Sequence, residues 1–240
     1  MNLLLLEVGE VVNGEARLEG RRLEHVKSVL RLAAGDSLRV GLLGGSMGVA
    51  TVTSISDTTL VLKTSELTDL PPPRANVSLV LAIPRPKQLK RVIPAIASLG
   101  VDRVMLVNAA RVEKSYFDSK VLNAEFLDEL VRLGLEQACD TVKPVIEVRE
   151  RLKPFVEDEL PSWIPSGAVR LLPHPTGAEA LKPVDARQHV VLAIGPDGGW
   201  VPYEVELFSR AGFTPVSLGR RVLRGEVAVP AVLGAVRAAL

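Results

Sequence analysis

The chain has 240 residues but only one cysteine, Cys139, and three histidines. A single cysteine excludes an intramolecular disulfide framework and any zinc site built from cysteines. The histidines, at positions 25, 174 and 189, are too far apart for a His-x-x-x-His motif on a helix, so we expect no metal site. Aromatic residues make up only 4% of the sequence, and the core must therefore consist mainly of Val, Leu, Ile and Ala.

Long hydrophobic segments are also missing. The longest apolar run, Val227–Val236, has about half of the ~18 residues that a bilayer-spanning helix needs. The short run Leu3–Leu6 has no basic region before it, so we expect no signal peptide. Together these features predict a cytoplasmic protein without a membrane partner.

Neither sign of charge dominates, since 29 Lys and Arg side chains stand against 28 Asp and Glu side chains. The basic residues are nevertheless clustered, because no acidic residue occurs between Pro71 and Val101. The two basic groups are Arg74, Arg85, Lys87, Lys90 and Arg91, and then Arg220, Arg221 and Arg224. Local clusters on a nearly neutral protein favour a small anionic docking site over a general polyanion-binding surface.

The first seventy residues have the pattern of a small β-structure. Short β-branched runs, at 37–40, 49–55 and 58–63, are separated by glycines, and a short amphipathic helix over 23–30 precedes them. We predict a small β-barrel with one helix over residues 1–70. The stiff segment Pro71–Pro73 then marks the domain boundary.

From residue 74 to residue 240 the pattern changes to alternating strands and helices. The predicted strands are 77–83, 104–107, 169–172, 190–194 and 215–218, and the predicted helices are 87–99, 123–138, 203–211 and 226–240. Alternation of this kind indicates an α/β domain with a parallel sheet. Pro230 is compatible with the last helix if it lies in the first turn.

Three segments that follow predicted strands in the second half are candidates for a ligand site. They are Leu171–Pro175, Ile194–Trp200 and Leu218–Glu226. Ligands of open α/β sheets bind where the strands end, and the glycines of Ile194–Trp200 allow a close backbone approach. That segment contains neither a Walker A motif nor G-x-G-x-x-G. On the glycines alone a tight turn is as good an interpretation, but three such segments together favour a ligand site.

The same region contains the string Ile194–Gly199, then Glu204, Gly212-Phe213 and Leu218-Gly219-x-Arg221-x-Leu223-Arg224-x-Glu226-x-Ala228. This string resembles the RsmE family, the 16S rRNA uridine N3-methyltransferases of the SPOUT superfamily. The family pattern reads Ile-Gly-Pro-Glu-Gly-Gly, followed by Leu-Gly-x-Arg-Ile-Leu-Arg-Thr-Glu-Thr-Ala. Weaker matches, at His25-x-x-x-Val29-Leu30-Arg31, Gly35-Asp36, Leu99–Val101 and Glu136-Gln137, extend the resemblance over nearly the whole chain.

The resemblance implies a PUA-like β-barrel that helps to hold RNA, at residues 1–70, and a SPOUT methyltransferase domain at residues 74–240. The second domain would end in a deep trefoil knot, which sequence patterns alone do not suggest. The cofactor would be S-adenosylmethionine, and the protein would be a homodimer. The residues implied for the cofactor site are Leu172, His174, Pro175, Ile194, Gly195, Pro196, Gly198, Gly199, Leu218, Gly219, Val222 and Leu223.

The chain departs from the family pattern next to the expected substrate. Gly225 and Val227 stand where the family has threonines, so two hydroxyl groups are missing from this loop. Asp197 replaces a glutamate and keeps the negative charge. The missing hydroxyls are compatible with a different target nucleotide or a different efficiency, whereas the cofactor loops are retained.

Methylation of uracil N3 requires that the N3 proton is removed and that N3 lies in line with the methyl group, ~3–3.5 Å away. A cation near O2 or O4 would stabilise the uracil anion, and Arg224 is our catalytic candidate for this role. Glu226 is the candidate proton acceptor or substrate orienter. The alternative for both residues is a plain ion pair at the start of a helix.

The candidates for RNA binding are Arg21, Arg22, Arg31, Arg85, Lys87, Lys90 and Arg91. The alternative for the last three is a solvated helix face, because they follow i, i+3, i+4 spacing. The expected activity is methylation of N3 of a specific uridine in 16S rRNA, free or within the small ribosomal subunit. The alternatives are a SPOUT methyltransferase with another RNA target and a non-catalytic RNA-binding or assembly factor that keeps the fold.

Overall fold

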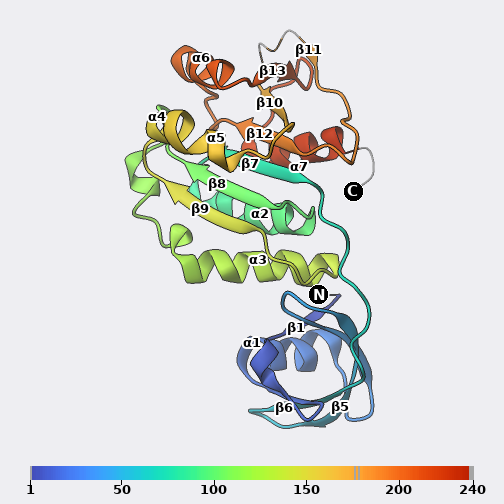
Figure 1. The fold of residues 1–240 in the computed structure, drawn as a ribbon. Helices are drawn as coiled ribbons and strands as arrows, with labels where there is room; N and C mark the ends of the chain where they lie inside the picture. The colour runs from blue at the N-terminus through green and yellow to red at the C-terminus, as the bar shows by residue number, and fades with distance from the viewer. Residues whose placement is uncertain (1, 176, 178, 238–240) are drawn as a thin grey trace. The chain divides into compact units, whose positions relative to one another are not determined.

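The structure is a computed structural model that describes residues 2–175, 177 and 179–237 (Figure 1). It divides into two compact units, with a boundary between Pro73 and Arg74. The first unit also contains the later segment Arg132–Lys143, which we had assigned to the second domain. This segment is joined to the first unit by backbone hydrogen bonds, since the Glu136 carbonyl accepts from the N–H groups of Asn2 and Leu3, each at 3.0 Å.

The first unit is a curled sheet of six strands in the order β1-β4-β5-β6-β3-β2. The strands are β1 (Leu4–Leu6), β2 (Val11–Val12), β3 (Glu15–Leu18), β4 (Ser37–Leu42), β5 (Met47–Ile55) and β6 (Leu60–Thr64). β1 pairs in parallel with β4, and the other pairs are antiparallel. The expected strands at 37–40, 49–55 and 58–63 are therefore present, whereas the sequence pattern had missed the three strands before residue 20.

The helix of the first unit has an unusual second half. An α-helical turn, α1 (Gly20–Glu24), continues as a π-helical segment (His25–Leu30), and Arg31 ends it with a φ of 54°. Leu23 and Val26 of this helix are buried in one hydrophobic core with β-strand residues such as Leu6, Val40 and Leu62. The predicted amphipathic helix thus covers one face of the curled sheet.

The second unit contains a seven-stranded, wholly parallel sheet in the order β11-β13-β10-β12-β7-β8-β9. The strands are β7 (Val77–Ala82), β8 (Arg103–Val107), β9 (Val145–Arg149), β10 (Val169–Pro173), β11 (Glu179–Ala180), β12 (Val190–Ile194) and β13 (Thr214–Ser217). Every residue of the central strands β7 and β12 is buried, as their continuous apolar runs predict. The α/β class with a parallel sheet is confirmed.

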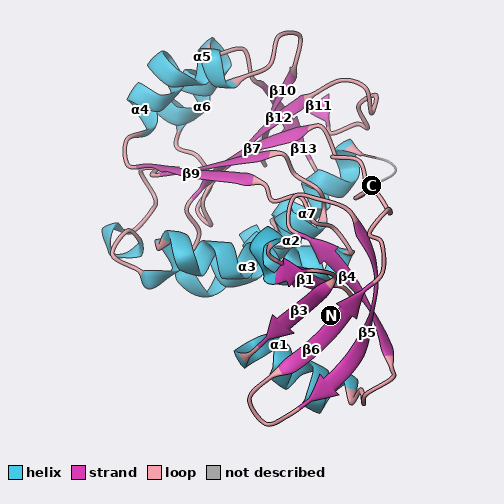
Figure 2. Ribbon diagram, turned by 60° about the horizontal axis from the view of Figure 1, so that its bottom comes forward, coloured by secondary structure: helices cyan, strands magenta, loops and turns pink. Residues whose placement is uncertain are grey.

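Helices cover both faces of this sheet. They are α2 (Pro86–Ser98), α3 (Ala124–Ala138), α4 (Leu152–Pro154), α5 (Leu160–Trp163), α6 (Pro202–Arg210) and α7 (Gly225–Val236). A π-helical turn (Phe155–Glu159) joins α4 to α5, and short 3-10 turns (Lys114–Tyr116 and Lys120–Leu122) precede α3. Figure 2 shows α4, α5 and α6 on one side of the sheet and α2 and α7 on the other.

Helix α7 corrects one expectation about a proline. The helix begins at Gly225, so Pro230 lies in its second turn rather than in the first. Proline lacks the N–H that would bond to the Glu226 carbonyl, and such a position normally disturbs a helix. Here Val229, Val232 and Leu233 are fully buried around it, and we attribute the persistence of the helix to this packing.

Residues 2–175, 177 and 179–237 lack two further features. No helix in this part of the chain combines the length and the apolarity that a bilayer crossing requires. Nor does it contain a group of three or more His, Cys, Asp or Glu side chains arranged to hold a metal ion.

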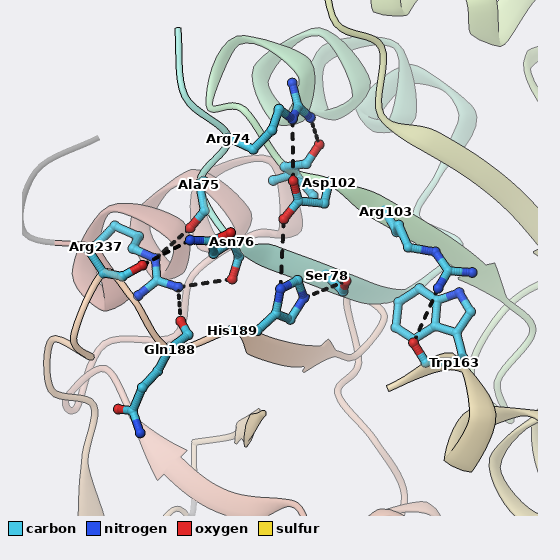
Figure 3. Close-up of polar contacts among 12 residues, drawn as sticks. Arg74, Ala75, Asn76, Ser78, Asp102, Arg103, Trp163, Gln188, His189 and Arg237 are labelled. Carbon is cyan, nitrogen blue, oxygen red and sulfur yellow. Dashed lines mark hydrogen bonds and ion pairs between the residues drawn. The ribbon is translucent and has the colours of Figure 1, made fainter. Parts of the chain in front are cut away.

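A polar chain lies at the amino ends of three neighbouring strands of the second unit (Figure 3). The Ser78 hydroxyl lies 2.9 Å from Nε2 of His189, whose Nδ1 is 4.0 Å from the Asp102 carboxylate. Ser78 is completely buried in β7. The Ser78 hydroxyl is therefore closed to any substrate, and we assign a structural role to this network of Ser78, His189 and Asp102.

We expect His189 to make the second unit sensitive to acid. Burial lowers the pKa of His189 below its ordinary value, and the nearby Asp102 carboxylate offsets only part of this effect. Because the unfolded chain binds the proton more tightly, protonation favours unfolding once the pH falls through about 6.5. Below that pH, the free energy of unfolding of the wild type should fall with decreasing pH. We expect this fall to be smaller in His189→Gln, by up to ~1.4 kcal/mol per pH unit.

Urea unfolding at pH 7.5 and pH 5.5 measures this difference. Trp163 and Trp200 are the only tryptophans of the chain, and both belong to the second unit. Their fluorescence therefore follows the unit that contains His189. The same loss of stability in His189→Gln and wild type would show that another group titrates, and His25→Gln, in the first unit, is the matched control.

Candidate active site

The three segments singled out in the sequence converge on one cavity. They follow β10, β12 and β13, which are neighbours in the sheet, so their carboxyl ends meet at one edge. The cavity has a volume of about 100 Å³. Its walls are formed by Pro173, His174, Pro175, Ile194, Gly195, Pro196, Asp197, Gly199, Trp200, Leu218, Gly219, Arg221, Val222, Leu223, Ala228 and Val232.

The loop after β12 is folded too tightly to accept larger residues at its glycines. A Cβ atom at Gly195 would lie 2.9 Å from the Trp200 backbone nitrogen, and Gly199 has a φ of +71°. Trp200 is buried and its indole N–H donates to the Ala193 carbonyl at 3.3 Å. Trp200 thus holds the loop against the core, and the backbone of the loop faces the cavity.

Ten of the twelve residues predicted for the cofactor site line this cavity; the two exceptions are Leu172 and Gly198. Leu172 is fully buried in β10, beneath the wall. Gly198 lies on the other side of its loop, where a Cβ atom would meet the side chain of Arg111 at 2.8 Å. Helix α7 supplies two wall residues that we had not assigned, Ala228 and Val232.

A second cavity adjoins the first and shares Asp197, Val222 and Leu223 with it. Its volume is about 320 Å³, and its other lining residues are Arg85, Gln88 and Arg224. The larger cavity alone falls within the ~300–1,000 Å³ that small-molecule sites occupy, and the smaller one lies below that range. The smaller one has mainly apolar walls, and the larger one has two arginines at its edge.

The two catalytic candidates lie side by side in the chain but have different surroundings. Arg224 is the N-cap residue of α7, and its carbonyl accepts from the N–H groups of Val227 and Ala228. Its side chain is exposed and makes no hydrogen bond or ion pair with the other described residues. Glu226 instead forms an ion pair with Arg91 of α2, at 3.1 Å. The alternative that Arg224 and Glu226 simply pair with each other has no support in these contacts.

Arg85 and Asp197 form the rim between the cavities. Nε of Arg85 lies 3.5 Å from the Asp197 carboxylate, and the Arg85 side chain is 67% exposed. An exposed pair of this kind contributes little to stability, so it can open at little cost. Gly225 lies next to it, since a Cβ atom there would be 3.6 Å from Asp197 Oδ1.

Two residues that support the glycine loop were missed by the sequence analysis. Arg111, from the segment after β8, donates to the Gly198 carbonyl. Glu204 of α6 is buried and accepts from the backbone N–H groups of Ala110 and Val201, at 2.8 and 2.9 Å. Glu204 was noted only as part of the family string, and its partner Ala110 is 94 residues away, which no local pattern reveals.

The basic residues proposed for RNA binding differ in how far their charges are already neutralised. In the first unit, Arg21 makes two hydrogen bonds to the buried carboxylate of Glu136, and Arg22 donates to Glu10 at 2.7 Å. Arg31 is exposed and has no such partner among the described residues.

In the second unit, the candidates follow the strand β7. Lys87 is exposed and forms no ion pair with a described residue, whereas Arg85 and Arg91 pair with Asp197 and Glu226. The Lys90 ammonium lies 5.1 Å from the centre of the Phe126 ring. Arg31 and Lys87 are therefore the candidates whose charge is most available to a phosphate.

Comparison with known proteins now decides the family. The sequence profile described as the RNA methyltransferase domain matches residues 71–237. A protein of Treponema pallidum named ribosomal RNA small subunit methyltransferase E is 35% identical, over 99% of this chain and 91% of its own length. The chain belongs to the RNA methyltransferase family. The resemblance to RsmE is confirmed, because a Synechocystis protein of the same name is also 28% identical over 99% of this chain and 77% of its own length.

Solved structures of the family share the fold. The ribosomal RNA small subunit methyltransferase E of Neisseria gonorrhoeae, bound to S-adenosyl methionine, superimposes with a TM-score of 0.78 at 22% identity. The match covers 98% of this chain and 96% of that one. A methyltransferase of Legionella pneumophila in complex with the same cofactor gives a TM-score of 0.76 at 24% identity, covering 99% of this chain and 97% of its own. At these identities the comparison establishes the fold of this family member.

Proposed function

We propose that the chain is an S-adenosylmethionine-dependent methyltransferase that acts on N3 of a uridine in 16S rRNA. The observation that carries the proposal is the convergence of three strand-exit segments on one cavity, in a chain of the RNA methyltransferase family. The family members named above are small-subunit rRNA methyltransferases, which supports 16S rRNA as the substrate.

The residues around the smaller cavity have the chemistry that the cofactor needs. Ile194, Leu218, Leu223 and Val232 supply apolar walls for a planar base, as pockets for nucleosides require. The glycines let the backbone approach a ligand closely. S-adenosylmethionine would supply an electrophilic methyl group when bound, and the neighbouring larger cavity would receive the nucleotide that accepts it.

The finer features of the fold belong to the same proposal. The curled sheet of the first unit supports a PUA-like domain that holds RNA, and the parallel sheet of the second supports a SPOUT domain with a C-terminal trefoil knot. We infer a homodimer on the same ground. Leu218, Val222 and Val227, next to the cavities, are exposed apolar side chains of the kind that a second copy would cover.

Two side chains would carry the chemistry at N3. The guanidinium of Arg224, which lines the larger cavity without a partner among the described residues, would stabilise negative charge on a uracil carbonyl oxygen. Glu226 would accept the N3 proton or orient the base. Its ion pair with Arg91, at 3.1 Å, positions the carboxylate at the start of α7.

The exposed cations would position the RNA through its phosphates. We expect the logarithm of the RNA-binding constant to fall linearly with the logarithm of the salt concentration. Each of Arg31→Ala and Lys87→Ala should reduce that slope by ~0.7–0.9, because each removes one phosphate contact. Filter binding to 16S rRNA at several salt concentrations measures the slope. Arg187→Ala is the control, because Arg187 forms an ion pair with Asp185. Slopes equal to wild type would remove Arg31 and Lys87 from the RNA interface.

Two experiments separate the proposed function from its alternatives. Calorimetric titration with S-adenosylmethionine distinguishes an enzyme from a non-catalytic RNA-binding or assembly factor, because only the enzyme needs the cofactor. Mapping of modified bases in 16S rRNA from a strain that lacks this gene, with and without the restored gene, identifies the target. A methyl group that appears elsewhere than on uridine N3 would favour another RNA target, an outcome that Gly225 and Val227 in place of threonines make worth testing.

A further inference from the structure

The last described residue of the chain is a buried arginine. Arg237 is only 4% exposed and follows directly on helix α7. Its guanidinium donates five hydrogen bonds, which is the full number of N–H groups that arginine has. The acceptors are the carbonyl oxygens of Ala75 (2.7 Å), Asn76 (2.9 Å), Val184 (3.2 Å), Asp185 (3.0 Å) and Gln188 (2.6 Å).

These carbonyls come from two segments that lie next to each other but are far apart in sequence (Figure 3). Ala75 and Asn76 directly precede β7, and the other three residues precede β12. The Val184 N–H also donates to the Val236 carbonyl, at 2.9 Å. The end of α7 is therefore bonded to the starts of both central strands, and among the described residues no carboxylate forms an ion pair with Arg237.

A charged side chain is expensive to bury without a carboxylate partner, so this arrangement needs a reason. A lysine in this place would have three donors on one nitrogen. It could not reach carbonyls of both segments as the planar guanidinium does. The geometry thus depends on arginine itself. The guanidinium fixes the end of a helix that contributes Ala228 and Val232 to the cofactor cavity.

Helix α7 connects this anchor to the site. Ala228 and Val232, one and two turns from its start, form part of the cavity wall, and Arg224 is its N-cap residue. At its beginning, the helix is bound to α2 through the ion pair between Glu226 and Arg91, in which the Arg91 side chain is 73% exposed. Such an exposed pair restrains the helix weakly. Beyond the apolar packing of Val229, Val232 and Leu233, the stronger polar restraint on α7 is therefore the buried anchor at its other end.

We propose that Arg237 is a positioning residue for the cofactor site, which sets the affinity for S-adenosylmethionine by fixing helix α7 against the starts of β7 and β12. This inference rests on the proposed function. A helix end that is free to move leaves the wall at Ala228 and Val232 unformed for part of the time, and the observed affinity falls by that fraction.

The test compares Arg237→Gln with Arg103→Gln. Arg103 is a matched control in the same unit, since it bonds to the Trp163 carbonyl at 3.3 Å and lies 4.9 Å from the Trp163 ring, on the other side of the network in Figure 3. We expect Arg237→Gln to raise the dissociation constant and the KM for S-adenosylmethionine at least roughly tenfold, with kcat at saturating cofactor nearly unchanged. Arg103→Gln should leave the dissociation constant within about twofold of wild type.

Hydrogen exchange of the amides in 225–236 gives a second measurement that needs no cofactor. We expect faster exchange in Arg237→Gln and unchanged exchange in Arg103→Gln. An Arg237→Gln protein that binds S-adenosylmethionine as tightly as wild type would overturn the proposal. If that variant does not fold, Arg237→Lys decides the question, since we expect weaker binding than wild type and equal binding would overturn it.

The same experiment keeps the two proposals apart. A wild-type protein that does not bind S-adenosylmethionine at all would contradict the proposed function. The anchoring of α7 by Arg237 would then be tested by the exchange rates alone. Equal rates in wild type and Arg237→Gln would contradict it.

Discussion

Replacement of Arg224 with alanine is expected to lower the rate of methyl transfer roughly 10²–10³-fold, which is the usual effect of removing a group that stabilises developing negative charge. The side chain lines the larger cavity and has no partner among the described residues, so its removal leaves no buried group unpaired. The affinity for S-adenosylmethionine should stay within about threefold of wild type, because Arg224 does not line the smaller cavity.

Single-turnover assays with saturating cofactor and 16S rRNA measure this effect on the chemical step. Arg220→Ala is the matched control, since Arg220 is an exposed arginine of the same loop that lines neither cavity. Equal rates in Arg224→Ala and wild type would remove Arg224 from the mechanism. A rate lost equally in both variants would instead point to general RNA binding by the loop.

The second large effect is expected at Gly195. A Cβ atom there would lie 2.9 Å from the Trp200 nitrogen and 3.2 Å from the Gly199 carbonyl carbon, and both are backbone atoms of the same tight loop. Since backbone cannot give way as a flexible side chain does, Gly195→Ala must displace the loop, at a typical cost of ~1–3 kcal/mol. If the cofactor requires the original loop, its affinity falls roughly tenfold to a hundredfold.

Calorimetric titration with S-adenosylmethionine tests this prediction. Gly234→Ala is the control, because Gly234 lies in α7 with nothing within 4 Å of the added methyl group and alanine favours a helix. Circular dichroism would show whether both proteins remain folded. A folded Gly195→Ala protein with wild-type affinity would mean that the cofactor does not depend on this loop.

The position of the candidate site could be predicted from the sequence because it depends on strand ends. The strand 190–194 is a continuous apolar run, the strand 169–172 is apolar apart from Arg170, and glycine or proline follows each of them. In a parallel sheet such ends meet at one edge. The expectation of parallel strands was therefore enough to predict that the segments after them converge, namely Leu171–Pro175, Ile194–Trp200 and Leu218–Glu226.

Other features depend on contacts that no local pattern encodes. The five carbonyls around Arg237 are 49 to 162 residues away in sequence, and the sequence around it shows only an exposed-looking arginine at the end of an apolar helix. β9 was missed for a different reason. Its residues Val145–Arg149 are exposed or half-buried at the edge of the sheet, so they lack the continuous apolar run that marks the central strands.

We have proposed that the turns after β10, β12 and β13 form the binding site for the methyl donor. A crystal structure of the protein grown with S-adenosylmethionine tests it most directly. We expect the adenosine between Ile194, Leu218 and Leu223, with the methyl group directed toward the cavity that Arg224 lines. Cofactor bound at another place, or these three turns separated in the crystal, would contradict it.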